Sequence, residues 1–285
     1  MKPLTSQALE LIGKDWSVSS LTREAHLQHT KDFANFVRKT FALEKIRDLK
    51  PNHILTYVQE MKKNGLDNGT MCNRLASVRE LANAIGKGNI VARDNKEYGI
   101  ARGSRQKPII QNSGEVNRIR AELAARANAG DRTAIMCHAA AEMRDAFGLR
   151  AKESLMSFKL IDTTTGAAIL LNSLAVEGAK GGRSRSLVIE NNVQMRAVQQ
   201  VELAAKVLGS GTGRCIPPEM SLKQAYNAQR TLWAELGGTK ANNAHMHASR
   251  HKVAQEMFAN RYSKGEIMER LGHGEDRSPF CYIPK

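Results

Sequence analysis

The chain has 285 residues, a formal net charge of +15 and four cysteines. This length suffices for two domains, each with its own hydrophobic core. Both the first 106 residues and the remainder carry an excess of Lys and Arg. The charge therefore favours a protein that closes around a polyanion such as nucleic acid, rather than one with a single basic tail. A basic protein that is merely soluble is the alternative that charge alone leaves open.

The cysteines and the apolar segments exclude several classes of protein. Cys72, Cys137, Cys215 and Cys281 are scattered and form no C-x-x-C pair. Neither a zinc knuckle nor a disulfide framework is therefore expected, and a reducing compartment is favoured. The N-terminus has no apolar signal core, and no window approaches the roughly 18 apolar residues of a membrane span. We expect a cytoplasmic protein without a membrane partner.

The first 90 residues have helical periodicity and no strand pattern. After a short amphipathic patch at residues 8–12, the apolar spacing predicts helices over residues 21–41 and 51–63. Pro51 opens the second of these, at a position where a first helical turn accepts proline. Residues 68–70 are interpreted as the cap of a further helix that ends at Gly86. We therefore predict a small helical domain over residues 1–90.

Residues 91–112 are rich in glycine and basic residues and poor in periodicity, which predicts a linker. Arg102, Arg105 and Lys107 in this stretch could lie along a phosphate backbone. Aromatic residues of the kind that stack on unpaired bases do not alternate with these cations, so duplex binding is favoured over single-strand binding.

Residues 113–285 combine helices with a few short strands. Ser113 is the expected cap of one helix, and a second is predicted from about residue 131 to 147, with residues 151–155 beginning another. Apolar runs at residues 158–162, 167–171 and 186–189, separated by glycine-containing turns, predict a small antiparallel sheet. Helices over residues 192–208 and 221–236 follow. The predicted fold is mainly α with a small antiparallel β-sheet.

The last forty residues hold an H-x-x-R box at His247 and Arg250, an L-G-H box that ends at His273, and Tyr282. On a helix, His247 and Arg250 share a face, and Gly265 is expected to separate this helix from a shorter one over residues 266–271 that ends at Gly272. Guanidiniums bind phosphate oxygens in a forked geometry, imidazoles move protons, and a phenol can act as a nucleophile. Together these residue types indicate a site for a phosphodiester.

This arrangement resembles the active-site end of the tyrosine recombinases, the phage-integrase family. Upstream, residues 148–153 carry the G-L-R-x-x-E box of that family, and Lys180 lies where the family has a lysine on the turn of a β-hairpin. The spacings of 23 residues from Arg250 to His273, and of 9 from His273 to Tyr282, are similar to those of the family. The resemblance is specific over residues 148–282.

The resemblance implies a SAM-like core-binding domain over residues 1–90 and an α+β catalytic domain over residues 113–285. It also implies a site-specific recombinase or integrase, of the kind that mobile genetic elements carry, which cuts and rejoins duplex DNA. The reaction would pass through a 3′-phosphotyrosyl intermediate, with no metal, ATP or other cofactor. The implied catalytic residues are Arg150, Lys180, His247, Arg250, His273 and Tyr282.

Each implied role suits its residue type. Tyr282 would attack the phosphorus, and the two arginines would stabilise charge on the equatorial oxygens. His247 would act as general base or hydrogen-bond donor, and His273 would orient the phosphate. Lys180 would protonate the leaving oxygen.

The implied partners are double-stranded DNA and further copies of the chain, as a dimer to tetramer on that DNA. Accessory DNA-bending proteins are additional candidates, and the expected location is the prokaryotic cytoplasm, at the nucleoid during the reaction. Candidate DNA contacts, each of which could instead belong to a solvated surface, are Lys62, Lys63, Arg74, Arg79, Arg102, Arg105, Arg183 and Arg185.

Several alternatives compete with this interpretation. Arg144 is a rival for the role of Arg150, but it lacks the preceding Gly-Leu and the following Glu. His245, His247 and His251 could be arranged as a metal cluster, although no carboxylate completes it. Cys281 could be imagined as a nucleophile, but no base accompanies it.

Type IB topoisomerases and telomere resolvases share the chemistry, and a DNA-binding protein that no longer cuts is the rival from another class. Two features depart from the family pattern. Only three residues follow Tyr282, where many members continue into a helix that docks on the neighbouring protomer. The residues before Tyr282 read SPFC, whereas the family commonly has threonine there.

Overall fold

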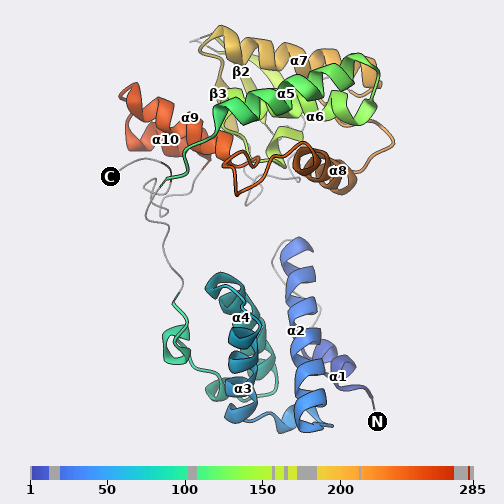
Figure 1. Ribbon diagram of the computed structural model, residues 1–285, viewed down its shortest axis with the longest axis vertical. Coiled ribbons are helices and arrows are strands. Elements are labelled where there is room, and N and C mark those ends of the chain that lie inside the picture. The colour runs from blue at the N-terminus through green and yellow to red at the C-terminus, as the bar shows by residue number, and fades with distance from the viewer. Residues whose placement is uncertain are drawn as a thin grey trace. The chain divides into compact units, whose positions relative to one another are not determined.

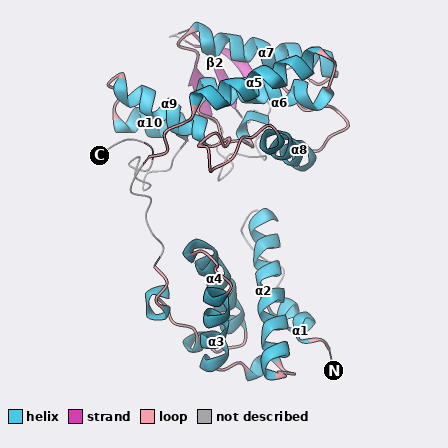
Figure 2. Cartoon of the chain, in the orientation of Figure 1, coloured by secondary structure: helices cyan, strands magenta, loops and turns pink. Residues whose placement is uncertain are grey.

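The computed structural model describes residues 2–12, 20–101, 108–155, 158–163, 166–171, 185–211, 213–272 and Tyr282. They belong to two compact units, which divide between Ser104 and Arg105. Most of the described residues are helical, and the second unit contains a small antiparallel sheet (Figures 1 and 2). This confirms the predicted fold class. None of the described helices is long and apolar enough to cross a membrane.

The first unit is a helical domain with its own apolar core. Its helices are α1 (Leu4–Leu11), α2 (Ser20–Phe41), α3 (Pro51–Lys63) and α4 (Asn68–Ala84). Phe33 is fully buried and its ring lies edge-on to Tyr57, with 5.0 Å between centroids. The predicted cap at residues 68–70 is wrong by one position. The carboxylate of Asp67 accepts a hydrogen bond from the backbone N–H of Thr70 at 3.0 Å, so Asn68 is already helical.

The chain remains packed on this first unit after α4. Two short 3-10 helices, η2 (Gly88–Ile90) and η3 (Asn95–Tyr98), follow, and Val91 and Ile100 are buried in the core of the unit. Nε of Arg79 donates to the carbonyl of Ala92 at 2.8 Å. Composition assigned residues 91–101 to a linker, whereas burial and hydrogen bonding attach them to the helical domain.

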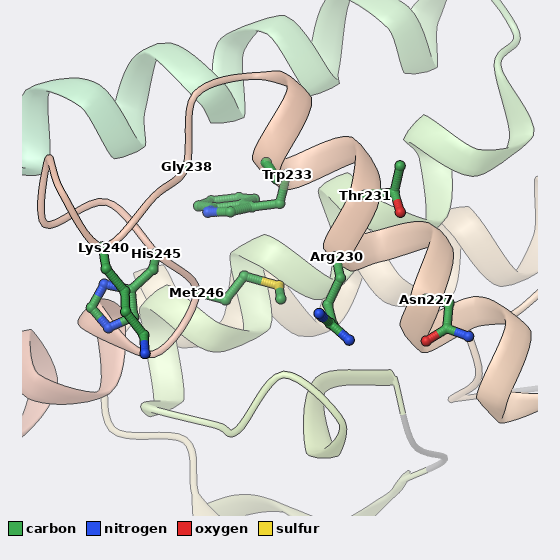
Figure 3. A pocket seen from close by; sticks show the side chains of 9 residues that line it. Asn227, Arg230, Thr231, Trp233, Gly238, Lys240, His245 and Met246 are labelled. Atoms are coloured by element: carbon green, nitrogen blue, oxygen red, sulfur yellow. The ribbon is translucent and has the colours of Figure 1, made fainter. Parts of the chain in front are cut away.

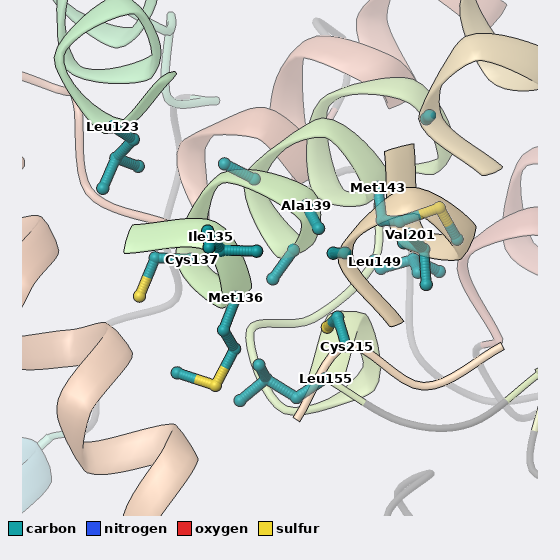
Figure 4. Close-up of a cluster of buried hydrophobic side chains, with 14 of the residues drawn as sticks. Leu123, Ile135, Met136, Cys137, Ala139, Met143, Leu149, Leu155, Val201 and Cys215 are labelled. Atoms are coloured by element: carbon teal, nitrogen blue, oxygen red, sulfur yellow. The ribbon is translucent and has the colours of Figure 1, made fainter. Parts of the chain in front are cut away.

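The second unit is arranged around helix α6 (Arg132–Phe147), which is buried on most of its faces. Helices α5 (Ser113–Asn128), α7 (Asn192–Leu208), α8 (Leu222–Glu235) and α9 (Ala248–Ala259) all contact it. Small side chains such as Ala139 alternate with larger ones such as Met136 and Met143, and this variation lets neighbouring helices approach closely (Figure 4). Helix α10 (Lys264–Leu271) packs on α9.

Two helix starts in this unit differ from the predictions. Helix α5 is capped by Asn112, not by Ser113, because the Asn112 side chain accepts from the N–H of Glu115 at 3.1 Å. Helix α10 begins at Lys264, since Ser263 and Glu266 form a reciprocal capping box. Gly265 therefore lies inside the helix and does not break the chain there.

The described strands are β1 (Phe158–Thr163), β2 (Gly166–Leu171) and β3 (Arg185–Val188), in the order β1-β2-β3 with antiparallel pairing. Ile169 pairs with Leu187, and both side chains are buried against the helices, whereas Leu160 is half exposed. The helix expected at residues 151–155 is instead a turn followed by the 3-10 helix η4 (Glu153–Leu155). Strand β1 begins three residues after η4, and its first N–H donates to the carbonyl of Gly213 at 3.2 Å.

Candidate active site

The turn after α6 presents Arg150. Gly148 ends α6 in the left-handed conformation, and a Cβ there would lie 3.2 Å from Val253 and Leu271. The backbone conformation therefore favours glycine, which also lets Val253 of α9 and Leu271 of α10 pack closely against the turn. Arg150 follows two residues later. Its backbone N–H donates to Oε2 of Glu153 at 2.9 Å, and its guanidinium binds Oε1 of the same carboxylate. Glu153 thus fixes both ends of the arginine.

Arg250 on α9 lies beside this turn and is completely buried. Its guanidinium donates to the carbonyl of Gly148 at 2.9 Å and to the carbonyl of Leu271, and Nη1 lies 3.9 Å from Oε2 of Glu153. Burial and then the nearby positive charge of Arg150 lower the pKa of Arg250 to about 10. Two neighbouring cations repel one another, and a bound anion would relieve that repulsion.

Tyr282 lies against the same helix. Its hydroxyl is 3.4 Å from Nε2 of His247, and the guanidinium of Arg250 lies 5.8 Å from the centre of its ring. His247 is the N-cap residue of α9, so it immediately precedes the helix that carries Arg250, whereas the sequence predicted it within that helix. A phenol, an imidazole and two guanidiniums therefore meet at the start of α9. Three of these groups come from residues 247–282, and the fourth, Arg150, comes from the turn after α6.

The loop that delivers His247 is anchored by Trp233 of α8. The indole N–H donates to the carbonyl of Ala244 at 2.8 Å, and a Cβ on Gly238 would lie 2.0 Å from that nitrogen. The indole lines a pocket of about 420 Å³, and Figure 3 shows the side chains around it. The pocket is lined by Asn227, Arg230, Thr231, Trp233, Ala234, Gly238, Lys240, His245 and Met246. These contacts hold the loop against α8.

Not every predicted catalytic residue can be placed. Lys180 and His273 lie outside the described residues, as do Cys281 and the candidate DNA contacts Arg102, Arg105 and Arg183. Arg185 is the first residue of β3, and the structure describes its backbone only.

The candidate DNA contacts of the first unit differ in what they bind. Arg74 pairs with Asp32 at 3.3 Å and donates to the Tyr57 hydroxyl at 3.1 Å, while Arg79 binds Ala92 and Asn95. Nζ of Lys62 donates to the Tyr98 carbonyl at 2.6 Å, and Lys63 is exposed at the end of α3. Arg74, Arg79 and Lys62 therefore have structural partners within the unit, and of the four candidates the two lysines are exposed.

Two residues at the site were not assigned to it from the sequence. The ring of His251 lies 4.5 Å from that of Tyr282, and Nε2 of Gln255 donates to the Tyr282 carbonyl at 3.1 Å. His251 follows His247 by four residues and Gln255 follows His251 by four, and this helical spacing was the available signal. The metal cluster considered at His245, His247 and His251 gains no support, because no three His, Cys, Asp or Glu side chains in the described part of the chain are arranged to hold an ion.

The chain matches two family models, that of the phage integrase N-terminal domain over residues 1–91 and that of the integrase domain over residues 113–256. No curated protein sequence matches it. Similar solved structures include XerH site-specific recombinase bound to its difH substrate, with 16% identity, a TM-score of 0.61, and 95% of this chain and 78% of that one covered.

Two further structures are similar in fold. A lambda integrase tetramer bound to a Holliday junction has 12% identity and a TM-score of 0.63, with 95% of this chain and 73% of that one covered. The Tn1549 transposon integrase in complex with transposon right-end DNA has 14% identity and a TM-score of 0.60, with 96% and 92% covered.

Proposed function

Because the chain belongs to the integrase family of tyrosine recombinases, we propose that it cuts and rejoins duplex DNA at specific sites through a covalent bond to Tyr282. The observation that carries the proposal is the position of the Tyr282 hydroxyl, 3.4 Å from Nε2 of His247 and on the same helix end as Arg250. A nucleophile, a proton acceptor and a buried cation are the groups that attack on a phosphodiester requires.

Each residue has a separate role in the reaction. Oη of Tyr282 attacks the phosphorus, the phenolic proton passes to His247, and the bond from phosphorus to O5′ breaks. Lys180 supplies the proton that O5′ takes up, while Arg150 and Arg250 bind the equatorial oxygens and His273 orients the phosphate. The products are a 3′-phosphotyrosyl bond and a free 5′-hydroxyl.

The same groups run the reaction in reverse on a different 5′-hydroxyl. Because one phosphoester replaces another, the covalent intermediate retains the free energy of the broken bond, and rejoining needs no ATP. The charge stabilisation that a metal would supply is provided by the two guanidiniums.

Exchange of strands between two duplexes requires several active sites, so the proposed partners are double-stranded DNA and two to four copies of this chain. The XerH, Tn1549 and lambda proteins were each solved on DNA, and the lambda integrase as a dimer and a tetramer. We place the reaction at the prokaryotic nucleoid, and we keep accessory DNA-bending proteins as further candidate partners.

Covalent trapping on randomised DNA tests this proposal whatever the target sequence is. The protein is incubated with a pool of nicked duplexes of randomised sequence, the mixture is denatured, and any DNA that stays attached is sequenced. A nick near the cut lets the short 5′-hydroxyl strand diffuse away, so the adduct accumulates. Wild type is expected to give an adduct on a defined sequence, and Tyr282→Phe none.

Two other outcomes would overturn the proposal in different ways. An adduct that persists in Tyr282→Phe would move the nucleophile to another residue. Sequence-selective retention of DNA by both proteins without any adduct would identify a DNA-binding protein that does not cut.

A further inference from the structure

Gln255 makes two hydrogen bonds to segments that are distant in the sequence. Its side-chain Nε2 donates to the carbonyl of Ile109 at 2.9 Å and to the carbonyl of Tyr282 at 3.1 Å. A primary amide nitrogen carries two hydrogens, so the two bonds can form together. One half-buried side chain on α9 therefore ties the entry of the second unit to the backbone of the candidate nucleophile.

Gln255 is the last of three residues, spaced four apart, that contact Tyr282 at successive points. His247 lies at the hydroxyl, His251 lies against the ring with 4.5 Å between centroids and a tilt of 33°, and Gln255 binds the carbonyl. His251 is itself buried and meets the ring of His247 edge-on at 5.4 Å. Because residues four apart lie on one face of a helix, one face of α9 and its N-cap contacts Tyr282 at the carbonyl, the ring and the hydroxyl.

We propose that Gln255 is a positioning residue, which holds the backbone of Tyr282 so that the hydroxyl stays at His247 and Arg250. This inference rests on the proposed function, since it assigns to Gln255 an effect on the attacking group. The tyrosine side chain has two rotatable bonds, and the contact with His251 restricts its ring. Gln255 binds the backbone carbonyl of the same residue directly and so holds Tyr282 at a third point.

A small displacement at this point has a large consequence for the rate. Misplacement of a reacting group by about 1 Å can lower a rate about 100-fold, because attack requires close approach and alignment. The loss of one neutral hydrogen bond allows a shift of that order. The expected effect is therefore a fall of about 10- to 100-fold in the rate of adduct formation.

The test compares Gln255→Leu and Gln255→Glu with wild type on a nicked duplex of the sequence that wild type captures. Leucine has a similar size and no donor, and an ionised glutamate keeps the shape but can only accept. Gln199→Leu is the matched control, since Gln199 is exposed on α7. Adduct formation is followed in single turnover over a range of DNA concentrations, below the melting transition of each variant.

We expect both Gln255 variants to lose about 10- to 100-fold in the maximal rate, while the DNA concentration at half-maximal rate stays within about threefold of wild type. The control should match wild type in both quantities. A purely structural role would lower the melting temperature and leave the maximal rate of the folded fraction unchanged.

A duplex with sulfur in place of the bridging 5′ oxygen at the cut provides a second measurement. A thiolate leaves without protonation, so this duplex restores the rate of variants that lack the acid. Gln255 variants should keep their deficit on it, because the defect lies in the attacking group.

The results distinguish a failure of the positioning role of Gln255 from a failure of the proposed DNA cleavage. If wild type forms no adduct, the proposed function fails. If wild type forms an adduct and both Gln255 variants keep its maximal rate, only the positioning role fails. A change confined to the half-saturating DNA concentration would also overturn it, since Gln255 would then serve DNA binding.

Discussion

The second unit buries two arginines in different ways. Both Arg144 on α6 and Arg250 on α9 are almost fully removed from solvent, and burial lowers the pKa of each to about 10. Arg250 lies beside a second guanidinium, that of Arg150, and beside the ring of Tyr282. Arg144 instead lies over the indole of Trp233, 4.8 Å from its centroid, and forms no ion pair with a carboxylate in the described residues.

The surroundings of Arg144 are those of a structural residue. Its Nη1 lies 3.4 Å from Oγ of Ser154, and Gln229 accepts from it when its amide is oriented to satisfy both neighbours. In that orientation Gln229 also donates to the carbonyl of Ala151 at 3.1 Å. Arg144 therefore supports the turn that presents Arg150, whereas Arg250 lies in the candidate site, beside Arg150 and Tyr282. Burial alone does not distinguish the two arginines; the adjacent cation and phenol do.

The largest expected effect comes from Arg250→Met, which keeps the apolar stem and removes the charge. The maximal rate of adduct formation should fall by about 100- to 1,000-fold, the usual loss when one group that stabilises a phosphorane or oxyanion is removed. Single-turnover trapping at saturating DNA measures this change, with Arg144→Met as the parallel control. Equal rate losses in the two variants would remove the functional distinction between these arginines.

Arg144→Ala should affect stability more than rate. A large buried side chain leaves a cavity, and Ser154 and Gln229 lose their partner, so the free energy of unfolding should fall by about 2–4 kcal/mol. Urea denaturation measures this loss. Once folded, the variant should form adducts within about tenfold of wild type, because Arg144 acts through the turn and does not touch the phosphate. An unchanged unfolding free energy would contradict the structural role.

Much of the second unit could be predicted from the sequence because its signals are local. Apolar periodicity identified the helices, and glycine-bounded apolar runs identified the strands at nearly their observed bounds. Several errors, in both units, lie where one side chain decides the start of a helix. Asp67 in the first unit and Asn112 in the second cap their helices one residue before the expected cap, and the Ser263 capping box places Gly265 inside α10. Such competition among neighbouring polar residues is not visible in periodicity.

Other features depend on contacts distant in the sequence. Composition could not reveal that Val91 and Ile100 are buried in the first unit, because glycines and charged residues surround them in the chain. The order of the boxes indicated Arg150, His247, Arg250 and Tyr282, whose described positions are close together. Gln255 belongs to no box. Its importance follows only from the two carbonyls, at positions 109 and 282, that the fold brings to it.

A smaller effect is expected for Glu153→Gln, which probes the carboxylate beside Arg250. The glutamine keeps the shape of the side chain but removes the negative charge that faces Arg150 and Arg250. The free energy of unfolding should fall by about 1.5–3 kcal/mol, the usual contribution of a hydrogen bond to a charged group. Adduct formation should slow as well, because Arg150 loses the carboxylate that orients it. Wild-type values for both quantities would show that Glu153 neither stabilises the turn nor orients Arg150.

The smallest expected effect comes from Glu142, a carboxylate that pairs with Arg120. Arg120 on α5 binds Glu142 and lies 3.2 Å from Asp145, both on α6. Burial alone would raise the pKa of the Glu142 carboxyl, but hydrogen bonds from His138 and Arg120 lower it to about 2. A carboxyl with a lowered folded-state pKa stabilises the protein above its unfolded pKa, here the ordinary value of 4.5, and this contribution is lost as the pH falls towards 2.

Glu142→Gln isolates this contribution. Near pH 7 the variant should unfold with about 1–2 kcal/mol less free energy than wild type, since part of the interaction is screened by solvent. As the pH falls from 4.5 towards 2, the difference should shrink, because wild type then loses the same charge. Urea denaturation across this range measures the difference, with Glu219→Gln, an exposed carboxylate paired with Arg132, as control. A difference that stays constant with pH would mean that Glu142 contributes through packing and not through its charge. The ion pair of Arg120 with Glu142 would then explain no difference in stability between Arg120 and Arg144, which has no carboxylate partner in the described residues.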